Sequence, residues 1–221
     1  MKNLTWPCVV AALLAGSSSF SYAQDKNALE GAYVGLGAGA TRARFVQDDF
    51  ATGLSGIEES KDGTDKGYKL TFGAKLSRHW ALEVGRTSFG KFSHTYDGTG
   101  SGIGSVVETY KSAGWWGSVL AILPIGNSFS LFGRLGEMKS VTTTESTNAT
   151  GTIIDTLAGN GVPVGGTKSK LSTILGVGMQ IDFPGKLGLR IEAEDYGTVG
   201  DSDNTGRARM RMATASLMYR F

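Results

Sequence analysis

Apolar and polar residues alternate one by one in long stretches of this chain, and that pattern limits its fold more than any other feature. In residues 66–76, Leu70 and Phe72 alternate with Lys69 and Thr71. Period-two alternation predicts β-strands with one apolar and one polar face. Eight segments follow this pattern: 31–45, 66–76, 80–92, 109–123, 129–141, 168–183, 187–196 and 208–221.

The connections between these segments alternate between short and long. The short ones are 77–79, 124–128 and 184–186, whereas the others are polar and rich in Gly, Thr, Asp and Ser. Each segment reaches the roughly ten residues that a tilted strand needs to cross a bilayer. Short turns at one end and long loops at the other are typical of membrane barrels. We therefore predict an all-β fold, an eight-stranded antiparallel transmembrane β-barrel with short periplasmic turns and long extracellular loops.

Residues 1–23 have the composition of a secretory signal peptide. Lys2 supplies the positive charge, residues 9–16 form an apolar run too short to span a bilayer, and Ala23 ends a small-residue cleavage site. We expect cleavage after Ala23, which leaves residues 24–221 as the outer membrane β-barrel domain. The only cysteine, Cys8, lies in the removed part, so the mature chain can form neither a disulfide nor a Cys-ligated metal site.

The charge balance and the lack of motifs argue against several function classes. Lys and Arg number 22 against 20 Asp and Glu, which is not the clustered basic excess of a nucleic-acid-binding protein. After residue 23, no run of 18 uninterrupted apolar residues predicts a transmembrane helix. The Gly-rich residues 35–40 are not followed by a helix, so they do not indicate a dinucleotide site. We predict no cofactor, no metal and no nucleic-acid partner.

The apolar alternation continues to the last residue. Leu217, Tyr219 and Phe221 occupy every second position at the end of the chain. A closed barrel has no edge, so its last strand pairs with its first and its end cannot fray. The three side chains resemble the C-terminal signal by which outer membrane barrels are recognised by their assembly machinery. That machinery is therefore an expected partner.

Three motifs, HWALEVGRTSFG (79–90), GRLGEM (133–138) and LRIEAEDYG (189–197), resemble strands of the OmpA-like (outer membrane protein A) transmembrane domain. The resemblance implies an eight-stranded barrel in the outer membrane of a Gram-negative bacterium. Because the sequence stops at the last strand, we expect no periplasmic peptidoglycan-binding domain, as in barrel-only members similar to outer membrane protein X. The family is described with an interior gate of two acids and two bases. Glu83 and Arg190 match two of its positions, and Leu120 and Gly178 stand at the other two.

Alternation turns five charged side chains toward the barrel interior. These candidates for lumen salt bridges are Glu83, Arg134, Arg190, Glu192 and Glu194. Charges within a membrane span are costly unless they are paired. The interior of an eight-stranded barrel is just wide enough for side chains to fill it. A static plug and a gated narrow pore both remain open, and Glu83 with Arg190 is the pair that we expect to meet across the lumen.

Basic residues gather at the long-loop ends of the first and last segments. Arg42 and Arg44 end the first segment, and the last contributes Arg207, Arg209 and Arg211. Guanidinium groups suit phosphates, so these five are possible lipopolysaccharide contacts. The alternative is a solvated rim that pairs with Asp201 and Asp203. Simple alternation turns Arg86 toward lipid. Either a bulge at Gly85 or Gly90 turns it inward, or it lies high enough in the membrane for its charge to snorkel to the surface.

An enzyme would need a nucleophile and a base. The chain has two histidines, His79 in a short turn and His94 near Ser93 and Asp97. Adjacent strand residues face opposite sides, which is poor geometry for a catalytic triad. We therefore predict no enzyme, and a lipid-modifying barrel is the third alternative.

The predicted function is a structural or surface-interaction role, in adhesion or envelope integrity. The runner-up is a narrow ion or small-solute pore with a salt-bridge gate. Exposed loops on a rigid scaffold are where recognition evolves, so a host or surface ligand would bind them. The long connections are the acidic 46–65, the glycine-rich 97–105, which we expect to be mobile, and the Thr- and Gly-rich 142–167.

Overall fold

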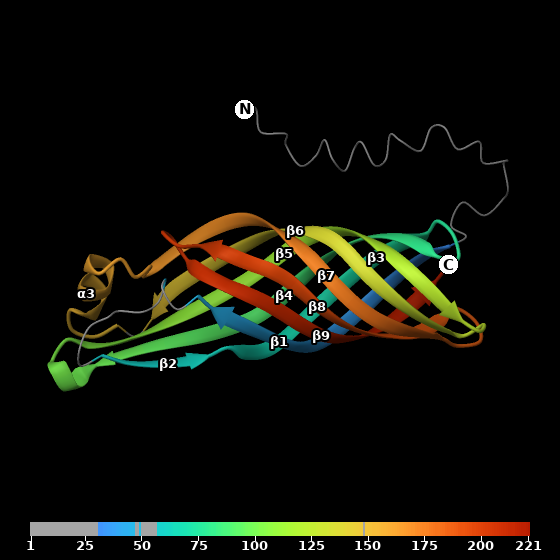
Figure 1. The fold of residues 1–221 in the computed structure, drawn as a ribbon. Helices are drawn as coiled ribbons and strands as arrows, with labels where there is room; N and C mark the ends of the chain where they lie inside the picture. The colour runs from blue at the N-terminus through green and yellow to red at the C-terminus, as the bar shows by residue number, and fades with distance from the viewer. Residues whose placement is uncertain (1–30, 47–48, 50–56, 148) are drawn as a thin grey trace, which may run out of the picture. The chain divides into compact units, whose positions relative to one another are not determined.

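The strands form one antiparallel sheet that closes on itself (Figure 1). The computed structural model describes residues 31–46, 49, 57–147 and 149–221. The proposed signal peptide with Cys8, and the loop acid Asp48, lie outside the described residues, so the signal peptide stays a prediction. The strands are β1 (Ala32–Phe45), β2 (Glu58–Asp62), β3 (Thr64–Lys75), β4 (Trp80–Gly98), β5 (Gly104–Ile125), β6 (Phe129–Thr147), β7 (Gly165–Asp182), β8 (Leu187–Asp201) and β9 (Gly206–Arg220).

Eight of the nine strands form the ring, which confirms the predicted fold class. Each pairs with its neighbours along the chain, and the ring closes where β1 pairs with β9. The short strand β2 pairs with β4 and, along the chain, precedes β3 by one residue, Gly63. Within the described residues no helix is long and apolar enough to cross a membrane.

The first and last strands pair over almost their whole lengths. Tyr33 lies opposite Arg220 at one end of this ladder, and Phe45 lies opposite Ala208 at the other. The alternating apolar residues of β9 face outward, with Leu217 56% exposed, and Phe221 after the strand is 53% exposed. The terminal stripe is therefore part of the outer wall of a closed sheet, as predicted.

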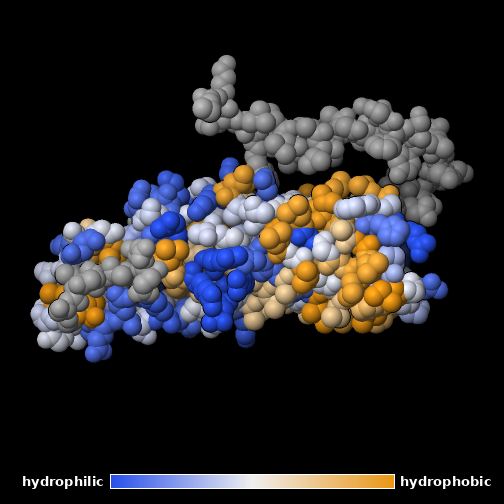
Figure 2. All heavy atoms as spheres, viewed as in Figure 1, coloured by the Kyte–Doolittle hydropathy of each residue, from blue (hydrophilic) through white to orange (hydrophobic). Residues whose placement is uncertain are grey.

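Exposed apolar side chains form a belt around the end of the barrel that carries the short turns (Figure 2). Trp80, Leu123, Leu131 and Leu217 are among its members. The two adjacent tryptophans of β5, whose orientation alternation alone leaves ambiguous, divide between the faces. Trp115 is 53% exposed in the belt, and Trp116 is buried inside the barrel. An apolar outer surface of this extent fits a hydrocarbon environment.

The strands extend beyond the predicted segments at the long-loop end. β4 continues to Gly98 and β5 begins at Gly104, so most of residues 93–108 is strand rather than loop. The connection expected to be a mobile loop is a tight turn with a 3-10 helix, Thr99–Ser101. Outside the belt both faces of a strand can be polar, so the apolar alternation fades while the backbone ladder continues.

A short helix that the sequence analysis missed, α3 (Ile153–Gly159), lies in the long β6–β7 connection. Its apolar residues Ile153 and Leu157, one turn apart, pack against Tyr96, Val106 and Val162 in a cluster that we call the outer cap. Figure 1 places α3 at the end of the barrel opposite the C-terminus. Seven residues are too few for a helical period to stand out in the sequence.

A bulge interrupts β4 between Ser88 and Lys91. Gly90 adopts φ +86° there, and a Cβ at this position would lie 2.4 Å from Asp65 Oδ2. Only glycine accepts both constraints without strain. The bulge resets the alternation, so Phe92, His94 and Tyr96 point inward above it.

Candidate functional site

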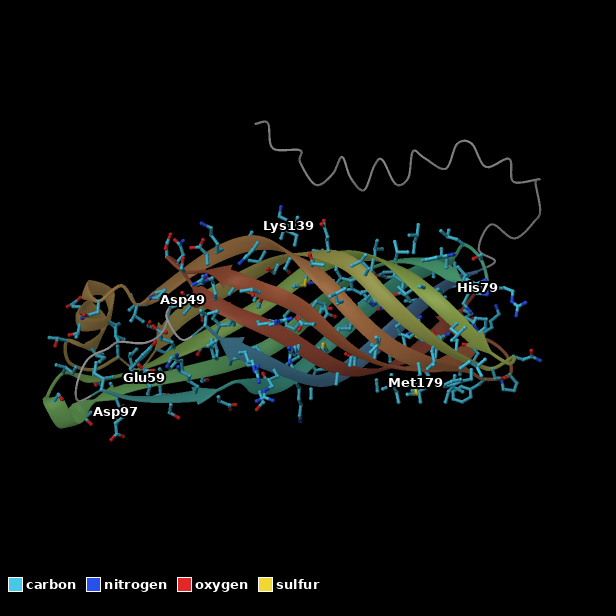
Figure 3. All side chains as sticks on the ribbon, viewed as in Figure 1. Asp49, Glu59, His79, Asp97, Lys139 and Met179 are labelled. Carbon is cyan, nitrogen blue, oxygen red and sulfur yellow. The ribbon has the colours of Figure 1, made fainter. Side chains whose placement is uncertain are left out.

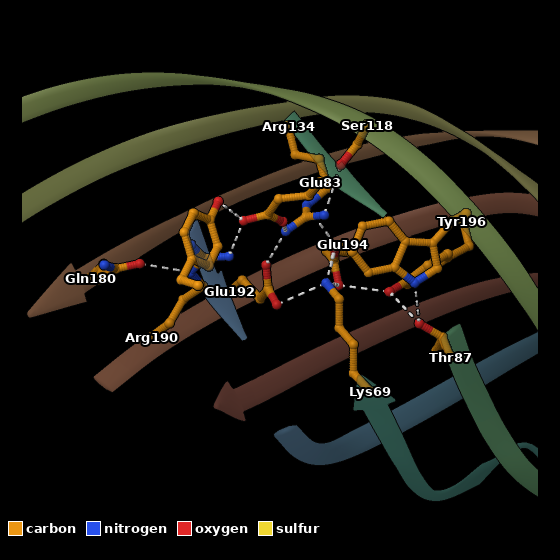
Figure 4. A network of polar contacts seen from close by, with 12 residues as sticks. Lys69, Glu83, Thr87, Ser118, Arg134, Gln180, Arg190, Glu192, Glu194 and Tyr196 are labelled. Carbon is orange, nitrogen blue, oxygen red and sulfur yellow. Dashed lines mark hydrogen bonds and ion pairs between the residues drawn. The ribbon is translucent and has the colours of Figure 1, made fainter. Parts of the chain in front are cut away.

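Six charged side chains meet inside the barrel at the level of the belt (Figure 4). Arg134 is central, because its guanidinium lies 2.6 Å from Glu83, 3.0 Å from Glu192 and 3.0 Å from Glu194. Lys69 Nζ lies 2.8 Å from Glu192 and 2.6 Å from Glu194. Three acids face three bases, counting Arg190, so the cluster is neutral overall. We call these six residues the lumen network.

Arg190 joins the network from β8. Its Nη1 donates a 2.6 Å hydrogen bond to Glu83 Oε1, and its Nε donates to Gln180 at 2.9 Å. Tyr33 also donates to Glu83 Oε1. The Glu83 carboxylate, on β4, is thus held from three sides of the interior.

Neutral side chains complete the coordination of the charges. Ser118 accepts a 2.9 Å hydrogen bond from Arg134 Nη1, and Tyr196 donates one of 2.7 Å to Glu194. The Trp116 ring lies 4.8 Å from both Lys69 Nζ and Arg134 Cζ, in cation–π contact. Buried charges are tolerated when partners of this kind satisfy them.

All five lumen salt-bridge candidates from the sequence meet in the network. The sequence analysis missed Lys69, although it lies on the polar face of its strand. The other two gate positions of the OmpA-like pattern carry no charge. Leu120 is buried beside Ala81 and Phe132, and the Phe132 ring closely approaches Gly178. Instead of charges at those two positions, this chain has Glu192 and Glu194 on β8, and both of these acids bind Arg134 and Lys69.

An apolar layer lies above the lumen network, on the side of the long loops. It includes Phe89, Met138, Ile174 and Met210, all buried. Trp116 and Tyr196 belong both to this layer and to the contacts of the network. Charged and apolar side chains thus fill successive levels of the interior.

On the outer wall, four arginines form what we call the arginine patch: Arg42, Arg44, Arg209 and Arg211. Arg42 lies directly opposite Arg211, and Arg44 opposite Arg209, across the β1–β9 ladder. Figure 2 shows a hydrophilic patch over β1, β8 and β9 next to the apolar belt. Like charges directly opposite one another destabilise a strand pair. Such a surface favours an anionic partner.

The acids that form ion pairs with these arginines and with Arg207 differ from those expected. Asp195 lies 2.9 Å from both Arg209 and Arg211, and Asp49 lies 2.7 Å from Arg207. The alternative pairing with Asp201 and Asp203 does not form among the described residues: Asp201 lies 3.7 Å from Lys168, and Asp203 accepts a hydrogen bond from Ser202. The side-chain hydrogen bonds from Arg207 hold the pKa of Asp49 below its usual range. Arg207 is thereby tied to the loop, apart from the patch.

Arg86 points outward, and its guanidinium lies 5.7 Å from the Trp115 ring. The bulge forms at Gly90, beyond Arg86, so it does not turn this side chain inward. The aromatic face and the outward position let the charge lie against the edge of the belt.

His94 and Glu108 are buried opposite one another on β4 and β5, above the belt. The His94 ring stacks on Tyr96 at 4.3 Å, and its Nε2 lies 3.7 Å from Glu59. Burial lowers the pKa of His94 to about 4. Neither carboxyl oxygen of Glu108 has a hydrogen-bond partner among the described residues, and burial raises its pKa to about 8.

Ser93 and Thr95, the neighbours of His94 along the chain, face the other side of the strand, and Asp97 accepts hydrogen bonds from Thr99. His79 lies in a short turn near the C-terminus, at the opposite end of the barrel from Asp97 (Figure 3). In the part of the chain that the structure describes, no three His, Cys, Asp or Glu side chains are close enough to hold a metal.

A family model for the outer membrane protein β-barrel domain matches residues 8–221. The chain belongs to this family. The match agrees with the resemblance to OmpA-like barrels and assigns the protein to the bacterial outer membrane.

The chain is similar to several solved structures. Neisserial surface protein A is similar with a TM-score of 0.55 and 10% identity, over 87% of this chain and 98% of that one. The N-terminal β-barrel domain of Pseudomonas aeruginosa OprF has a TM-score of 0.48 at 10% identity, over 87% and 98%. The attachment invasion locus protein Ail of Yersinia pestis has a TM-score of 0.43 at 14% identity, over 86% and 99%. No curated protein sequence matches the chain.

Because the chain belongs to this family, each end of the barrel can be assigned to one side of the outer membrane. The short turns face the periplasm, and the outer cap with β2 faces the cell exterior. The arginine patch lies beyond the apolar belt on the side of the long loops (Figure 2).

Proposed function

We propose that this outer membrane barrel has a structural or surface-interaction role, in adhesion or in envelope integrity, and does not conduct solutes. The observation that carries the proposal is the filled interior. Six buried charges bind one another at the level of the belt, and Phe89, Met138 and Ile174 occupy the level above. A solute would have to break ion pairs and then cross an apolar layer.

The surface-interaction part of the proposal rests on the extension above the membrane. β4, β5 and β6 are the longest of the described strands, and α3 packs against β4 and β5 through the outer cap. A ligand would thus meet an ordered surface, which lowers the entropic cost of binding. Asp97 and Glu59 lie in this extension (Figure 3).

We also propose that the arginine patch contacts the phosphates of lipopolysaccharide. Among the described residues, one acid, Asp195, pairs with the four guanidinium groups of these two adjacent strands, through Arg209 and Arg211. Bidentate guanidinium–phosphate pairs would relieve the repulsion between arginines that lie opposite one another.

The test compares three strains. One expresses the wild-type chain, one a variant in which a short Gly/Ser linker replaces residues 150–164, and one no chain. We expect attachment to cells or abiotic surfaces to require residues 150–164, while detergent resistance requires only the barrel. Unaltered attachment and detergent resistance in the strain without the chain would contradict both roles. Single-channel recording on the folded protein tests the runner-up function, a narrow pore. Lipid analysis of the same cells tests the third alternative, a lipid-modifying enzyme.

A further inference from the structure

A hollow runs down the lipid-facing wall of the barrel from the arginine patch. Its upper section, of about 580 Å³, is bordered by Arg42, Arg211 and Asp195. Its lower section, of about 590 Å³, lies on the belt between β5 and β9. The two sections share Val177, Ala193 and Ala213, so they form one continuous trough.

The floor of this trough is set by three alanines on neighbouring strands. Ala213 on β9 lies opposite Ala193 on β8 and opposite Ala40 on β1. All three face outward, where much of the surrounding wall carries large side chains such as Leu175 and Val177. Small residues in register across three strands thus leave a depression within an otherwise bulky apolar wall.

We propose that the trough and the arginine patch together form one binding site for an outer-leaflet lipid that carries both phosphate and acyl chains. A phosphate would lie against Arg42 and Arg211, and an acyl chain of the same molecule would fill the trough over Ala193 and Ala213. This inference rests on the proposed contact between the arginine patch and lipopolysaccharide phosphates, and it adds where the chain of that lipid lies.

Two physical arguments support a single occupant with a charged head and an apolar tail. In hydrocarbon an unfilled hollow forfeits dispersion contacts along its whole lining, so the trough favours a partner that follows its shape. At its upper end, Arg42 has no ion-pair partner among the described residues and lies opposite Arg211. A phosphate held there supplies the missing negative charge.

A second copy of the chain is a poorer occupant. Two copies share the same orientation and depth in the membrane, so a symmetric contact over the trough would bring one arginine patch against the other. Like charges facing one another across an interface oppose association. The lipid meets both the charge and the shape of the site, whereas the second copy meets only the shape.

The test uses the purified full barrel in nanodiscs of zwitterionic phospholipid, titrated with bis-phosphorylated hexa-acylated lipid A. Lipid A without its phosphates tests the contribution of the arginine patch. A phosphorylated disaccharide without acyl chains, or inorganic phosphate, tests the contribution of the trough. The variants are Arg42→Gln with Arg211→Gln for the patch, and Ala193→Phe with Ala213→Phe for the trough. Matched controls are Lys139→Gln, an exposed cation on β6, and Val84→Phe, an exposed belt residue on β4.

We expect each double variant to weaken lipid A binding by about tenfold or more, which corresponds to roughly 1.4 kcal/mol, while both controls bind as wild type. Wild-type affinity in the arginine variant would overturn the phosphate contact and the inference together. Loss of binding in the arginine variant with wild-type affinity in the phenylalanine variant would overturn the trough alone. Equal binding of inorganic phosphate and lipid A would identify a free-anion site, and a dimer broken by the phenylalanines would identify a second copy; either result contradicts the proposal. The attachment assay of the proposed function is independent of all these outcomes.

Discussion

The Arg190 guanidinium lies 2.6 Å from Glu83 inside the barrel, although their strands β8 and β4 are not neighbours in the sheet. The pair forms because the ring is narrow enough for long side chains to meet near its axis. Arg134 contacts the other oxygen of the same carboxylate at 2.6 Å, so Glu83 is shared by two cations. A carboxylate in this position couples three strands that have no mutual backbone hydrogen bonds.

Replacing one partner of this pair should destabilise the barrel strongly, because the other partner keeps its buried charge, whereas replacing both partners together should cost less than the two single changes combined. Glu83→Gln or Arg190→Met alone leaves a buried charge short of a partner, which typically costs about 3–5 kcal/mol. The double variant should cost less than the sum of the two single variants. Urea unfolding in lipid vesicles, followed by tryptophan fluorescence, measures the coupling.

The control for that cycle is Glu137→Gln, which removes an exposed carboxylate from the outer face of β6. We expect it to change the unfolding free energy by less than about 0.5 kcal/mol. Additive effects of the two interior variants would show that Glu83 and Arg190 do not interact.

The interior should not conduct ions in the wild-type protein. The lumen network and the apolar layer of Phe89, Met138 and Ile174 are two barriers in series. The Arg190→Met variant removes part of the first barrier and leaves the second, so it should also stay closed. Planar-bilayer recording on folded protein provides the measurement, and discrete openings of the wild type would contradict a sealed interior.

The terminal aromatic should matter for assembly. The Phe221 ring packs edge-on against Tyr219 at 5.4 Å, and its backbone N–H donates to Ala32 O at 3.1 Å. We expect Phe221→Ala to lower the amount of heat-modifiable barrel in the outer membrane several-fold, because it removes the terminal aromatic of the proposed recognition signal and its packing against Tyr219. Semi-native gel electrophoresis of outer membrane fractions reports this amount.

Asn127→Ala, in the exposed β5–β6 turn, is the matched control and should leave that amount unchanged. Arg220→Ala is not a neutral comparison. The Arg220 guanidinium lies 3.0 Å from Asp182 and donates to the carbonyls of Phe183 and Gly185 in the β7–β8 turn. Equal levels of Phe221→Ala and wild type would contradict a role of the terminus in assembly.

The outer cap should lose stability between about pH 6.5 and pH 8. Burial raises the pKa of Glu108 from 4.5 to about 8, so its contribution is full below pH 4.5 and is lost as the pH rises through 8. Burial lowers the pKa of His94 from 6.5 to about 4, so its contribution is full above pH 6.5 and is lost as the pH falls through 4. Between 4.5 and 6.5 the two changes offset each other, and above 6.5 only the loss from Glu108 remains.

Hydrogen exchange of the α3 amides, corrected for intrinsic rates, follows the opening of the outer cap. In wild type we expect protection to be level up to about pH 6.5 and to fall above it, by at most a few kcal/mol, since one pKa unit corresponds to roughly 1.4 kcal/mol. Glu108→Gln should remove the fall above that range and leave a loss only at acid pH. An unchanged alkaline fall in Glu108→Gln would assign the effect to another group.

Much of the barrel wall could be predicted from the sequence, because membrane strands repeat one local rule. Each residue of β9 from Ala213 to Tyr219 faces the side that its position in the alternation predicts, and Phe221 after the strand is exposed. The inward phase of Glu83, Arg134, Arg190, Glu192 and Glu194 follows from the same rule. Lys69 obeys it too, yet a single lysine between Tyr68 and Leu70 does not by itself indicate an ion pair. The rule also fails at the Gly90 bulge, where one extra residue reverses the phase of the strand.

The sequence by itself therefore determined the strands, their two faces and the outward apolar stripe at the C-terminus, since these depend on neighbours two residues apart. Only the tertiary structure decided which charges pair across the lumen, that Arg42 faces Arg211, and that three alanines align into a trough. These features depend on register between strands that are distant in the sequence, such as β1 and β9. A shift of that register by two residues would keep every side chain on its face but would separate Arg42 from Arg211 and Ala40 from Ala213.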